Sequence, residues 1–589
     1  MVQSRTDTCG GLRLSDAGRK VTLAGYYENM RKVSKNLGFL VLRDFYGVTQ
    51  IVIETGEMME KLSGVNTEST LQIEGTVRER SSRNPDMPTG DIEVVPDEIR
   101  ILGRCRYNEL PFGITKTKET DENARLRYRY LDLRNPEVRS NIVLRSRIVS
   151  ELRNAMTGHD FLEITTPVLT CSSPEGARDY LVPSRLHPGK FYALPQAPQQ
   201  FKQILMASGF DRYFQIAPCF RDEDARADRS PGEFYQLDME MAFATQEDVF
   251  AVIEDVLPPI FAKYGKYKKA SGAPFKRIAY LDAMDTYGTD KPDLRIDLKL
   301  TEVTGMFKGC LFEPFDNADV IKAVVVSGFE GSRKVIDRIV SDTETVSGGK
   351  SYWFKCSDDG TGLAGGVAKF LTEKQEEIIE KLSLKAKDVV FVSAGSRSQA
   401  LKTGGTLIKT IGATVPGHMD KEAYEFCWIV DFPMYEIGEE SGELEFCHNP
   451  FSMPQGGLEA LKSEDPLKIL AYQYDLVCNG VELSSGAVRN HDPEIMIEAF
   501  RLAGLTEEDV KSKFPAMYNA FCYGAPPHAG IAPGVDRMVM LIAGEDSIRE
   551  IIPFPMNKNA EDLMMGAPAA VEPKQLEEVH IAIVRDEKD

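Results

Sequence analysis

The segment FRDEDARADR, residues 220–229, places seven charged side chains of mixed sign in ten positions. It separates two strand-forming stretches, so we expect the tip of an antiparallel hairpin with Arg221 at its base. The second stretch, EFYQLDMEM, alternates, and one face carries an aromatic ring, an amide and two carboxylates: Phe234, Gln236, Asp238 and Glu240. Burying such a face without a ligand is costly, which predicts a binding site for a charged molecule. A solvated acidic hairpin is the alternative.

A second hairpin is predicted in YDLVCNGVELSSG, where Asn479-Gly480 is a strong two-residue turn signal. Counting outward from the turn makes Asp475 and Glu482 diagonal neighbours on one face. Two carboxylates this close repel each other unless a cation lies between them, and Mg²⁺ is the usual partner when phosphates are near. Arg489 follows, and we expect a bulge at residues 484–486 to direct it into the same site. A buried salt bridge explains these three charged residues equally well.

Two further segments bring polar side chains next to apolar elements. HAGIAPGVDRMVMLIAG is a Gly/Pro loop that leads into a helix apolar on nearly all sides, with Arg537 at its start. LPQAPQQFKQILM offers Gln199 and Lys202 about one turn apart on a helical face. Upstream, CSSPEGARDYLVP has the composition of a mobile lid, with Glu175 near its tip. We expect these side chains to converge with the two hairpins on one cavity.

The elements that must position these residues change in character along the chain. Five short β-rich runs in the first hundred residues predict a small closed barrel, of which the OB-fold is the commonest kind. An arginine-rich connector follows; a salt-bridged helix surface and a phosphate-binding face both suit it. A long helix then enters the strand FLEITTPVL. Gly-rich turns later alternate with one clear helix, at residues 372–382, in a predicted α+β insert that contains none of the chemistry-bearing motifs.

The predicted domain boundaries follow from these changes and from the position of the motifs. They are a barrel at 1–107, an arginine-rich hinge at 108–135, a first part of the chemistry-bearing domain at 136–287, the insert at 288–424, and a second part with a C-terminal extension at 425–589. A chain of 589 residues is too long for one core, so several domains are expected.

Composition narrows the class of protein. With 42% hydrophobic and 27% charged residues the chain is an ordinary soluble globular protein, and its net charge of −20 argues against indiscriminate nucleic-acid binding. The start, MVQSRTDTCGG, does not resemble a leader, and no apolar stretch approaches the roughly 18 residues of a membrane span. We therefore expect a cytoplasmic protein. The ten cysteines form no CxxC pair, which predicts reduced thiols and no structural zinc.

Taken together, the motifs resemble those of class II aminoacyl-tRNA synthetases, and within them the bacterial-type aspartyl-tRNA synthetases of subclass IIb. FLEITTPVL resembles motif 1, the dimer interface, with its proline at Pro167; FRDEDARADR with the following EF resembles motif 2, and GIAPGVDR resembles motif 3. SPEGARDYLVPSR and QFKQILM are similar to aspartyl-specific signatures. The likeness covers almost the whole chain and implies an OB-fold barrel, a catalytic domain built on an antiparallel sheet, and a GAD-like insert.

The resemblance implies a role for each matching residue. It assigns catalysis to Arg221, Glu482 and Arg537. ATP binding is implied for Arg221, Asp222, Glu223, Ser230, Phe234, Glu482, Gly534, Val535, Asp536 and Arg537, with the adenine between Phe234 and Arg537. Aspartate binding is implied for Glu175, Gln199, Lys202, Arg221, Asp238, His448 and Arg489, and Mg²⁺ binding for Asp475 and Glu482.

In the barrel, the resemblance implies that Phe39, Gln50 and Glu93 read the anticodon, with Arg31 and Lys32 as partial substitutes for a missing triple arginine. A core phenylalanine is the alternative for Phe39. The implied partners are L-aspartate, ATP, tRNA-Asp and a second copy of the chain.

Three departures from the family pattern are the stretch RSPGEF with Ser230 and the extra Gly232, Asn449 in CHNPFS, and the loop ENMRKVSKNLG before the anticodon-reading strand. The last two bear on tRNA choice. They motivate the hypothesis that tRNA-Asn is also charged and that an amidotransferase then repairs the product. Asparaginyl- and lysyl-tRNA synthetases, and a tRNA-binding paralogue without catalysis, are the competing interpretations.

Overall fold

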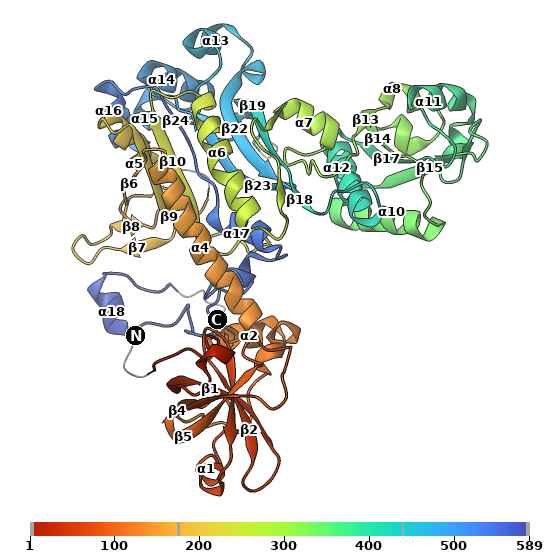
Figure 1. Cartoon of the computed structure of the whole chain (residues 1–589). Helices are drawn as coiled ribbons and strands as arrows, with labels where there is room; N and C mark the ends of the chain where they lie inside the picture. Colours follow the sequence, from red (N-terminus) through yellow and green to blue (C-terminus); the bar gives the residue numbers. More distant parts are fainter. Residues whose placement is uncertain (1–4, 173–176, 439–440, 585–589) are drawn as a thin grey trace. The chain divides into compact units, whose positions relative to one another are not determined.

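The computed structural model describes residues 5–172, 177–438 and 441–584 of the chain (Figure 1). It divides into two compact units, Met1–Thr120 and Asp121–Asp589. The division falls inside the segment predicted as an arginine-rich hinge. No helix within the described ranges is long and apolar enough to cross a membrane.

The first unit is a closed five-stranded barrel. Its strands are β1 (Lys20–Lys32), β2 (Gly38–Arg43), β3 (Val48–Ile53), β4 (Thr70–Glu79) and β5 (Ile92–Gly103), joined in the order β1-β2-β3-β5-β4, with helix α1 (Gly56–Lys61) after β3. Alternate residues of each strand fill the interior, as Leu23, Leu40 and Ile73 do. All five predicted strands are confirmed, and the barrel is the predicted OB-fold.

The second unit is built on an eight-stranded sheet in the order β12-β19-β22-β23-β24-β10-β9-β6. The strands are β6 (Leu162–Glu163), β9 (Arg212–Arg221), β10 (Gly232–Ala242), β12 (Lys276–Ala279), β19 (Phe426–Pro433), β22 (Leu470–Cys478), β23 (Val481–Val488) and β24 (His528–Ile531). Every pairing is antiparallel except β12 with β19 and β6 with β9. The predicted antiparallel catalytic sheet is therefore confirmed.

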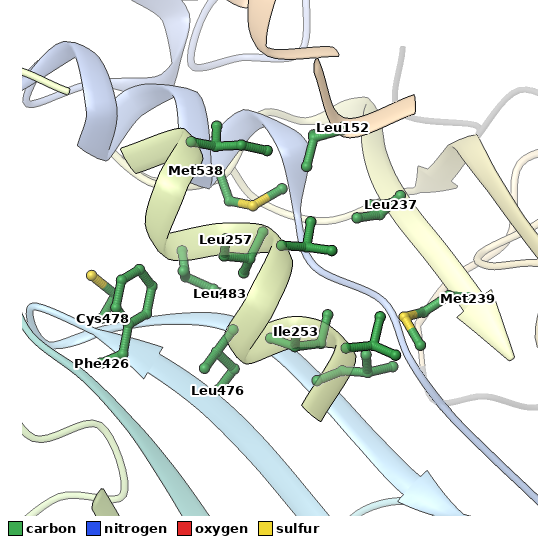
Figure 2. Close-up of a cluster of buried hydrophobic side chains, with 14 of the residues drawn as sticks. Leu152, Leu237, Met239, Ile253, Leu257, Phe426, Leu476, Cys478, Leu483 and Met538 are labelled. Atoms are coloured by element: carbon green, nitrogen blue, oxygen red, sulfur yellow. The ribbon is translucent and has the colours of Figure 1, made fainter. Parts of the chain in front are cut away.

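Three helices form an apolar core with this sheet: α4 (Pro136–Gly158), α6 (Gln246–Tyr264) and α17 (Val535–Ala543). Figure 2 shows side chains of all three helices against those of the strands. On β10, Leu237 and Met239 enter this core, so Asp238 and Glu240 point to the opposite face. The alternation predicted for this strand thus separates its core residues from its polar ones.

The other elements of this unit are shorter. They are α5 (Gln199–Ala207), α7 (Tyr280–Tyr287), α13 (Gly457–Ser463), α14 (Pro493–Leu502), α15 (Glu507–Lys513), α16 (Pro515–Cys522), α18 (Pro573–Glu578), and the strands β7 (Leu181–Pro183), β8 (Phe191–Ala193), β11 (Lys269–Ala270), β18 (Ala423–Tyr424), β20 (Tyr435–Ile437) and β21 (Leu444–Phe446).

The arginine-rich connector contributes structural ion pairs. It forms α2 (Glu122–Arg127) and α3 (Arg129–Asp132). Arg125 binds Glu550 through two parallel hydrogen bonds of 2.8 Å, and Arg129 donates to the carbonyls of Ile552 and Pro553 at 2.9 Å. Both arginines are buried. For these two residues the salt-bridged interpretation is correct and the phosphate-binding one is wrong.

Residues between β12 and β18 form a five-stranded antiparallel sheet in the order β13-β14-β17-β15-β16. The strands are β13 (Thr301–Glu302), β14 (Val320–Val326), β15 (Ser351–Cys356), β16 (Leu363–Ala364) and β17 (Val389–Gly395). The helices are α8 (Thr304–Phe307), α9 (Glu313–Asp316), α10 (Arg333–Ser347), α11 (Gln375–Lys381) and α12 (Arg397–Thr414). The expectation of one clear helix is wrong, because α10 and α12 are both longer than the predicted helix, which is reduced to α11.

Helix α12 escaped prediction because it contains Gly404, Gly405 and Gly412, which usually indicate turns. Each glycine lies where another segment approaches closely. A Cβ at Gly404 or Gly412 would lie 2.8 Å from a side-chain atom of Leu300 or Ile296, and one at Gly405 would lie 2.8 Å from the Gly288 carbonyl oxygen. Tertiary packing therefore selects glycine here, against its helix propensity.

Candidate active site

A cavity of about 550 Å³ lies where β9, β10, β22 and β23 meet α5 and the start of α17. The side chains that line it and that the sequence predicted are Gln199, Lys202, Arg221, Glu223, Ser230, Phe234, Asp238, His448, Asp475, Glu482, Gly534, Asp536, Arg489 and Arg537. The structure thus brings together residues from four segments that lie far apart in the sequence.

The first hairpin is antiparallel as predicted, and Arg221 lies at its base, opposite Gly232. The guanidinium of Arg221 lies over the Phe234 ring, 5.0 Å from its centroid, and its Nε is buried without a hydrogen-bond partner. The extra Gly232 has a φ of 83°, a left-handed conformation that glycine adopts without strain. The insertion is thus accommodated at the base of the hairpin, where it leaves Arg221 facing the cavity.

The second hairpin turns at Asn479-Gly480 and pairs Val477 with Glu482, as predicted. The register shifts between Leu476 and Val477, so the extra residue is Leu483 and not one of the residues 484–486. Burial raises the pKa of Asp475 well above its usual value, and the nearby Glu482 carboxylate raises it further. The two carboxylates are therefore close enough to interact, as the pairing predicted.

The charged residues at the deep end of the cavity are paired with each other. Lys202 Nζ lies 2.7 Å from Asp238 Oδ1 and 3.4 Å from Glu240 Oε2. Arg489 donates to both oxygens of Glu240, at 2.9 and 3.1 Å. Burial would raise the pKa of Glu240, but Arg489 and Lys202 outweigh it and the pKa is lowered. In Asp238 burial outweighs Lys202 and the pKa is raised.

Glu240 lies on the predicted polar face of β10, and it pairs with Arg489 and Lys202 although the resemblance implied no role for it. The resemblance implied aspartate binding for both Asp238 and Lys202, and here these two side chains also contact each other. The signal for Glu240 was present, because a carboxylate two residues from Asp238 shares its face. Its partner Arg489 is 249 residues away, and only the fold brings them together.

Arg537 enters the cavity from the first turn of α17. It donates to the carbonyl oxygens of Glu482 at 2.8 Å and Asp228 at 3.3 Å. The two residues before it have structural positions. Val535 is fully buried in the core, and Asp536 pairs with Arg145 and accepts a hydrogen bond of 2.9 Å from the Tyr235 amide.

Other predicted residues differ in whether they line the cavity. Glu223 lines it and pairs with Arg229 at 2.6 Å, whereas Asp222 is exposed and is absent from its lining. His448 lines it, and burial lowers the pKa of its imidazole. Glu175 lies outside the described residues.

Within the described parts of the chain, four buried polar atoms of this cavity have no hydrogen-bond partner: Gln199 Nε2, Arg221 Nε, Asp238 Oδ2 and Asp475 Oδ1. Unpaired buried groups of this kind are costly, so their concentration in one cavity indicates a ligand with both charges. Asp475 and Glu482 offer hard carboxylate oxygens that fit Mg²⁺. Among the described residues, no three His, Cys, Asp or Glu side chains form a metal-binding group, so phosphate oxygens and water would complete the coordination.

Lys291 also lines the cavity, and no sequence pattern predicted it. Its ammonium lies 2.6 Å from Asp290 Oδ2 and 3.3 Å from Glu482 Oε2. Burial lowers the pKa of this lysine, but Glu482 and Asp290 outweigh it and the net pKa is raised.

In the barrel, the predicted anticodon residues lie on adjacent strands. Arg31 lies over the Phe39 ring, 5.1 Å from its centroid, and pairs with it in register. Gln50 donates to Glu93 at 3.0 Å. Phe39 is half-buried and lies outside the barrel core, so the interpretation as a core phenylalanine is wrong. Lys32 is exposed at the end of β1.

Two models of known protein families match the chain. Residues 121–558 match the model for class II tRNA synthetases (D, K and N), and residues 21–102 match the model for the OB-fold nucleic acid binding domain. Because the first match covers more than half of the chain, the chain belongs to the class II tRNA synthetases.

The relatives narrow the class further. The chain is 51% identical over 589 residues to the aspartate–tRNA ligase of Streptomyces avermitilis, covering 99% of both chains. It is 51% identical over 590 residues to the aspartate–tRNA(Asp/Asn) ligase of Gluconobacter oxydans, covering 98% of both. Its fold is similar to that of the aspartyl-tRNA synthetase of Entamoeba histolytica, with a TM-score of 0.56, 19% identity, and coverage of 92% and 89%.

Proposed function

We propose that the chain activates L-aspartate with ATP and transfers the aspartyl group to the 3′ end of tRNA. In the first step a carboxylate oxygen of aspartate attacks the α-phosphorus, and the bond from that phosphorus to the oxygen bridging the β-phosphate breaks. Aspartyl-adenylate and pyrophosphate are the products. The observation that carries this proposal is the cavity in which Arg489 and Lys202, both almost fully buried, lie beside the stacked Arg221 and Phe234.

The deep end of the cavity suits the side chain of aspartate. A side-chain carboxylate there could pair with Arg489 and Lys202, whereas the neutral amide of asparagine would pair less strongly with both cations. Asp238 Oδ2 and Gln199 Nε2, which lack partners, are available to the ammonium and carboxylate groups of the amino acid. His448 lines the same cavity and completes the proposed set for the side-chain carboxylate.

The outer part of the cavity suits ATP. Arg221 would contact the α-phosphate and neutralise charge that accumulates there in the transition state. Phe234 would stack on the adenine, with Arg537 on its other side. Asp475 and Glu482 would hold Mg²⁺, which when bound neutralises charge on the departing pyrophosphate. Glu223, Ser230 and Gly534 line the same region.

The barrel supports a role in tRNA binding. Phe39 presents a ring and Gln50 an amide on adjacent strands, and unpaired bases stack on such rings and are recognised along their edges. We propose that both tRNA-Asp and tRNA-Asn are substrates, with an amidotransferase converting the aspartyl-tRNA-Asn. The relatives include ligases of both names, one for Asp and one for Asp/Asn.

The segment around Pro167 supports a dimer. Pro167 is exposed, and its exposed apolar neighbours are Leu162, Val168 and Leu169. A second copy of the chain related by a twofold axis would cover them.

ATP–pyrophosphate exchange with aspartate, asparagine and lysine in turn tests the activation step. We expect exchange with aspartate alone. Exchange driven by asparagine or lysine but not aspartate would favour a rival synthetase, and no exchange with any of the three would favour a tRNA-binding paralogue. Charging assays on purified tRNA-Asp and tRNA-Asn then test tRNA choice, and the absence of aspartylated tRNA-Asn would exclude the relaxed specificity.

A further inference from the structure

Lys291 lies at the start of the predicted insert, three residues after Gly288 ends α7. Its ammonium reaches back to the catalytic cavity, where it lies 3.3 Å from Glu482 Oε2. Asp290 Oδ2 holds the same ammonium at 2.6 Å. The side chain is 34% exposed, so the ammonium borders the cavity and is accessible from it.

The backbone around Lys291 is fixed by its neighbours. Pro292 follows it, which restricts Lys291 to an extended conformation, and the Lys291 amide donates to Thr289 Oγ1 at 3.1 Å. Asp293 and Arg295 form a bidentate pair of 2.9 and 2.7 Å. This segment packs on the turn of the second hairpin, because a Cβ at Gly480 would lie 3.2 Å from Asp293 Cβ. The position of the ammonium beside Glu482 therefore follows from the backbone.

The Glu482 carboxylate lies between two cations, because Lys291 approaches its Oε2 and Arg537 Nη1 lies 3.9 Å from its Oε1. Asp290 also contacts the Lys291 ammonium, and Asp475 Oδ1, in the lining of the same cavity, has no hydrogen-bond partner among the described residues. The positive charge of Lys291 lowers the attraction of Asp475 and Glu482 for a divalent cation, and it raises the attraction of the same place for a triphosphate. A nucleotide that arrives with the cation brings negative charge, which offsets the repulsion between the ammonium and the cation.

We propose that Lys291 is a positioning residue that makes the Asp475–Glu482 pair bind a divalent cation together with ATP rather than before it. Lys291 acts through Glu482, whose carboxylate it contacts. The proposal rests on the ATP site assigned under the proposed function. Lys291 lies in the segment that leads into the insert. Its contact with Glu482 therefore also connects the insert to the phosphate-binding end of the cavity.

The test compares Lys291→Met with Lys291→Arg, which keeps the positive charge. Binding of Mn²⁺ without nucleotide is followed by electron paramagnetic resonance, and the KM for ATP is measured by aspartate-dependent pyrophosphate exchange. We expect Lys291→Met to bind Mn²⁺ about fivefold more tightly and to raise the KM for ATP about fivefold. Lys291→Arg stays close to wild type in both. A residue with only a structural role would weaken both ligands together.

Unchanged or weaker Mn²⁺ binding in Lys291→Met would overturn the proposal. If that variant does not fold, as judged by its circular dichroism, Lys291→Gln must give the same two opposite changes. Failure of the wild-type enzyme to exchange pyrophosphate with aspartate would instead contradict the proposed function. An active wild-type enzyme with unaltered Mn²⁺ binding in the variants would contradict only the role of Lys291.

Discussion

The two ends of the catalytic cavity hold their charges in different ways. At the deep end Lys202, Asp238, Glu240 and Arg489 are at most 2% exposed, and each binds another member of the set. At the outer end the Arg537 and Glu482 side chains are 24% and 29% exposed, and Arg537 donates mainly to backbone carbonyls. The deep end is thus a rigid ion-pair network. The outer end is a set of more exposed side chains whose charged groups can still bind a ligand.

The difference suits the ligands proposed for the two ends. Fixed buried charges would distinguish a small dicarboxylic acid from its amide, because the amide pairs less strongly with the two cations. A nucleotide has to enter and its pyrophosphate has to leave, so the groups that contact it must be exposed to solvent and able to move. Substitutions at the two ends should therefore affect different kinetic constants.

The largest effect is expected from Arg489→Met at the deep end. The change removes the contact proposed for the side-chain carboxylate of aspartate, and it leaves Glu240 buried with Lys202 as its remaining ion-pair partner among the described residues. Losing one partner of a buried charge pair with a ligand costs about 2–5 kcal/mol, so we expect kcat/KM for aspartate to fall about 10³-fold, measured by pyrophosphate exchange. The KM for ATP should change little.

The double variant Arg489→Met, Glu240→Gln is the matched control. Removing both charges eliminates the unpaired carboxylate, so thermal stability should recover relative to the single variant while aspartate activation does not. Recovery of activity in the double variant would show that Arg489 acts through the fold and does not contact the substrate.

A smaller effect, of about 2 kcal/mol, is expected from His528, which lies beneath the deep end. Its Nε2 lies 3.2 Å from Gln203 Oε1, and burial lowers its pKa to about 4. The unfolded chain, with an ordinary pKa of about 6.5, binds the proton first as the pH falls. The stability contributed by the neutral ring is therefore complete above about pH 6.5 and is lost as the pH falls from there toward 4.

Denaturant unfolding of wild type and His528→Gln at pH 7.5 and pH 5.0 measures this effect. The wild type should lose about 2 kcal/mol more between the two pH values than the variant does, because only the wild type carries this ring. Equal losses in the two proteins would mean that His528 is as easily protonated in the folded state as in the unfolded one. The network at the deep end would then be less isolated from solvent than its burial indicates.

Much of the fold was predictable because it depends on local patterns. The barrel strands, both hairpins and the pairing next to the Asn479-Gly480 turn follow from alternation and turn residues, which act over a few positions. Helix α12 was missed because its three glycines are explained only by Gly288, Ile296 and Leu300, which pack against it. Local propensity and tertiary packing disagree there, and packing decides.

The candidate site was predictable where a motif carries it and not where distant segments meet. Arg221, Glu482 and Arg537 line one cavity, as the resemblance implied. Asp536 instead pairs with Arg145, which is 391 residues away, and Lys291 contacts Glu482 across a separation of 191 residues. Neither ion pair can be predicted from the sequence near the residues involved.

The smallest effect is expected at the outer end, from Phe234→Leu. The ring lies beneath Arg221 and faces the cavity, and stacking and cation–π contacts contribute about 1 kcal/mol. We expect the KM for ATP to rise about fivefold with the KM for aspartate unchanged, and Phe234→Tyr to stay near wild type because it keeps the ring. A rise in the KM for aspartate of the same size would show that the two ends are coupled, since loss of the ring would then have displaced Arg221 from both substrates.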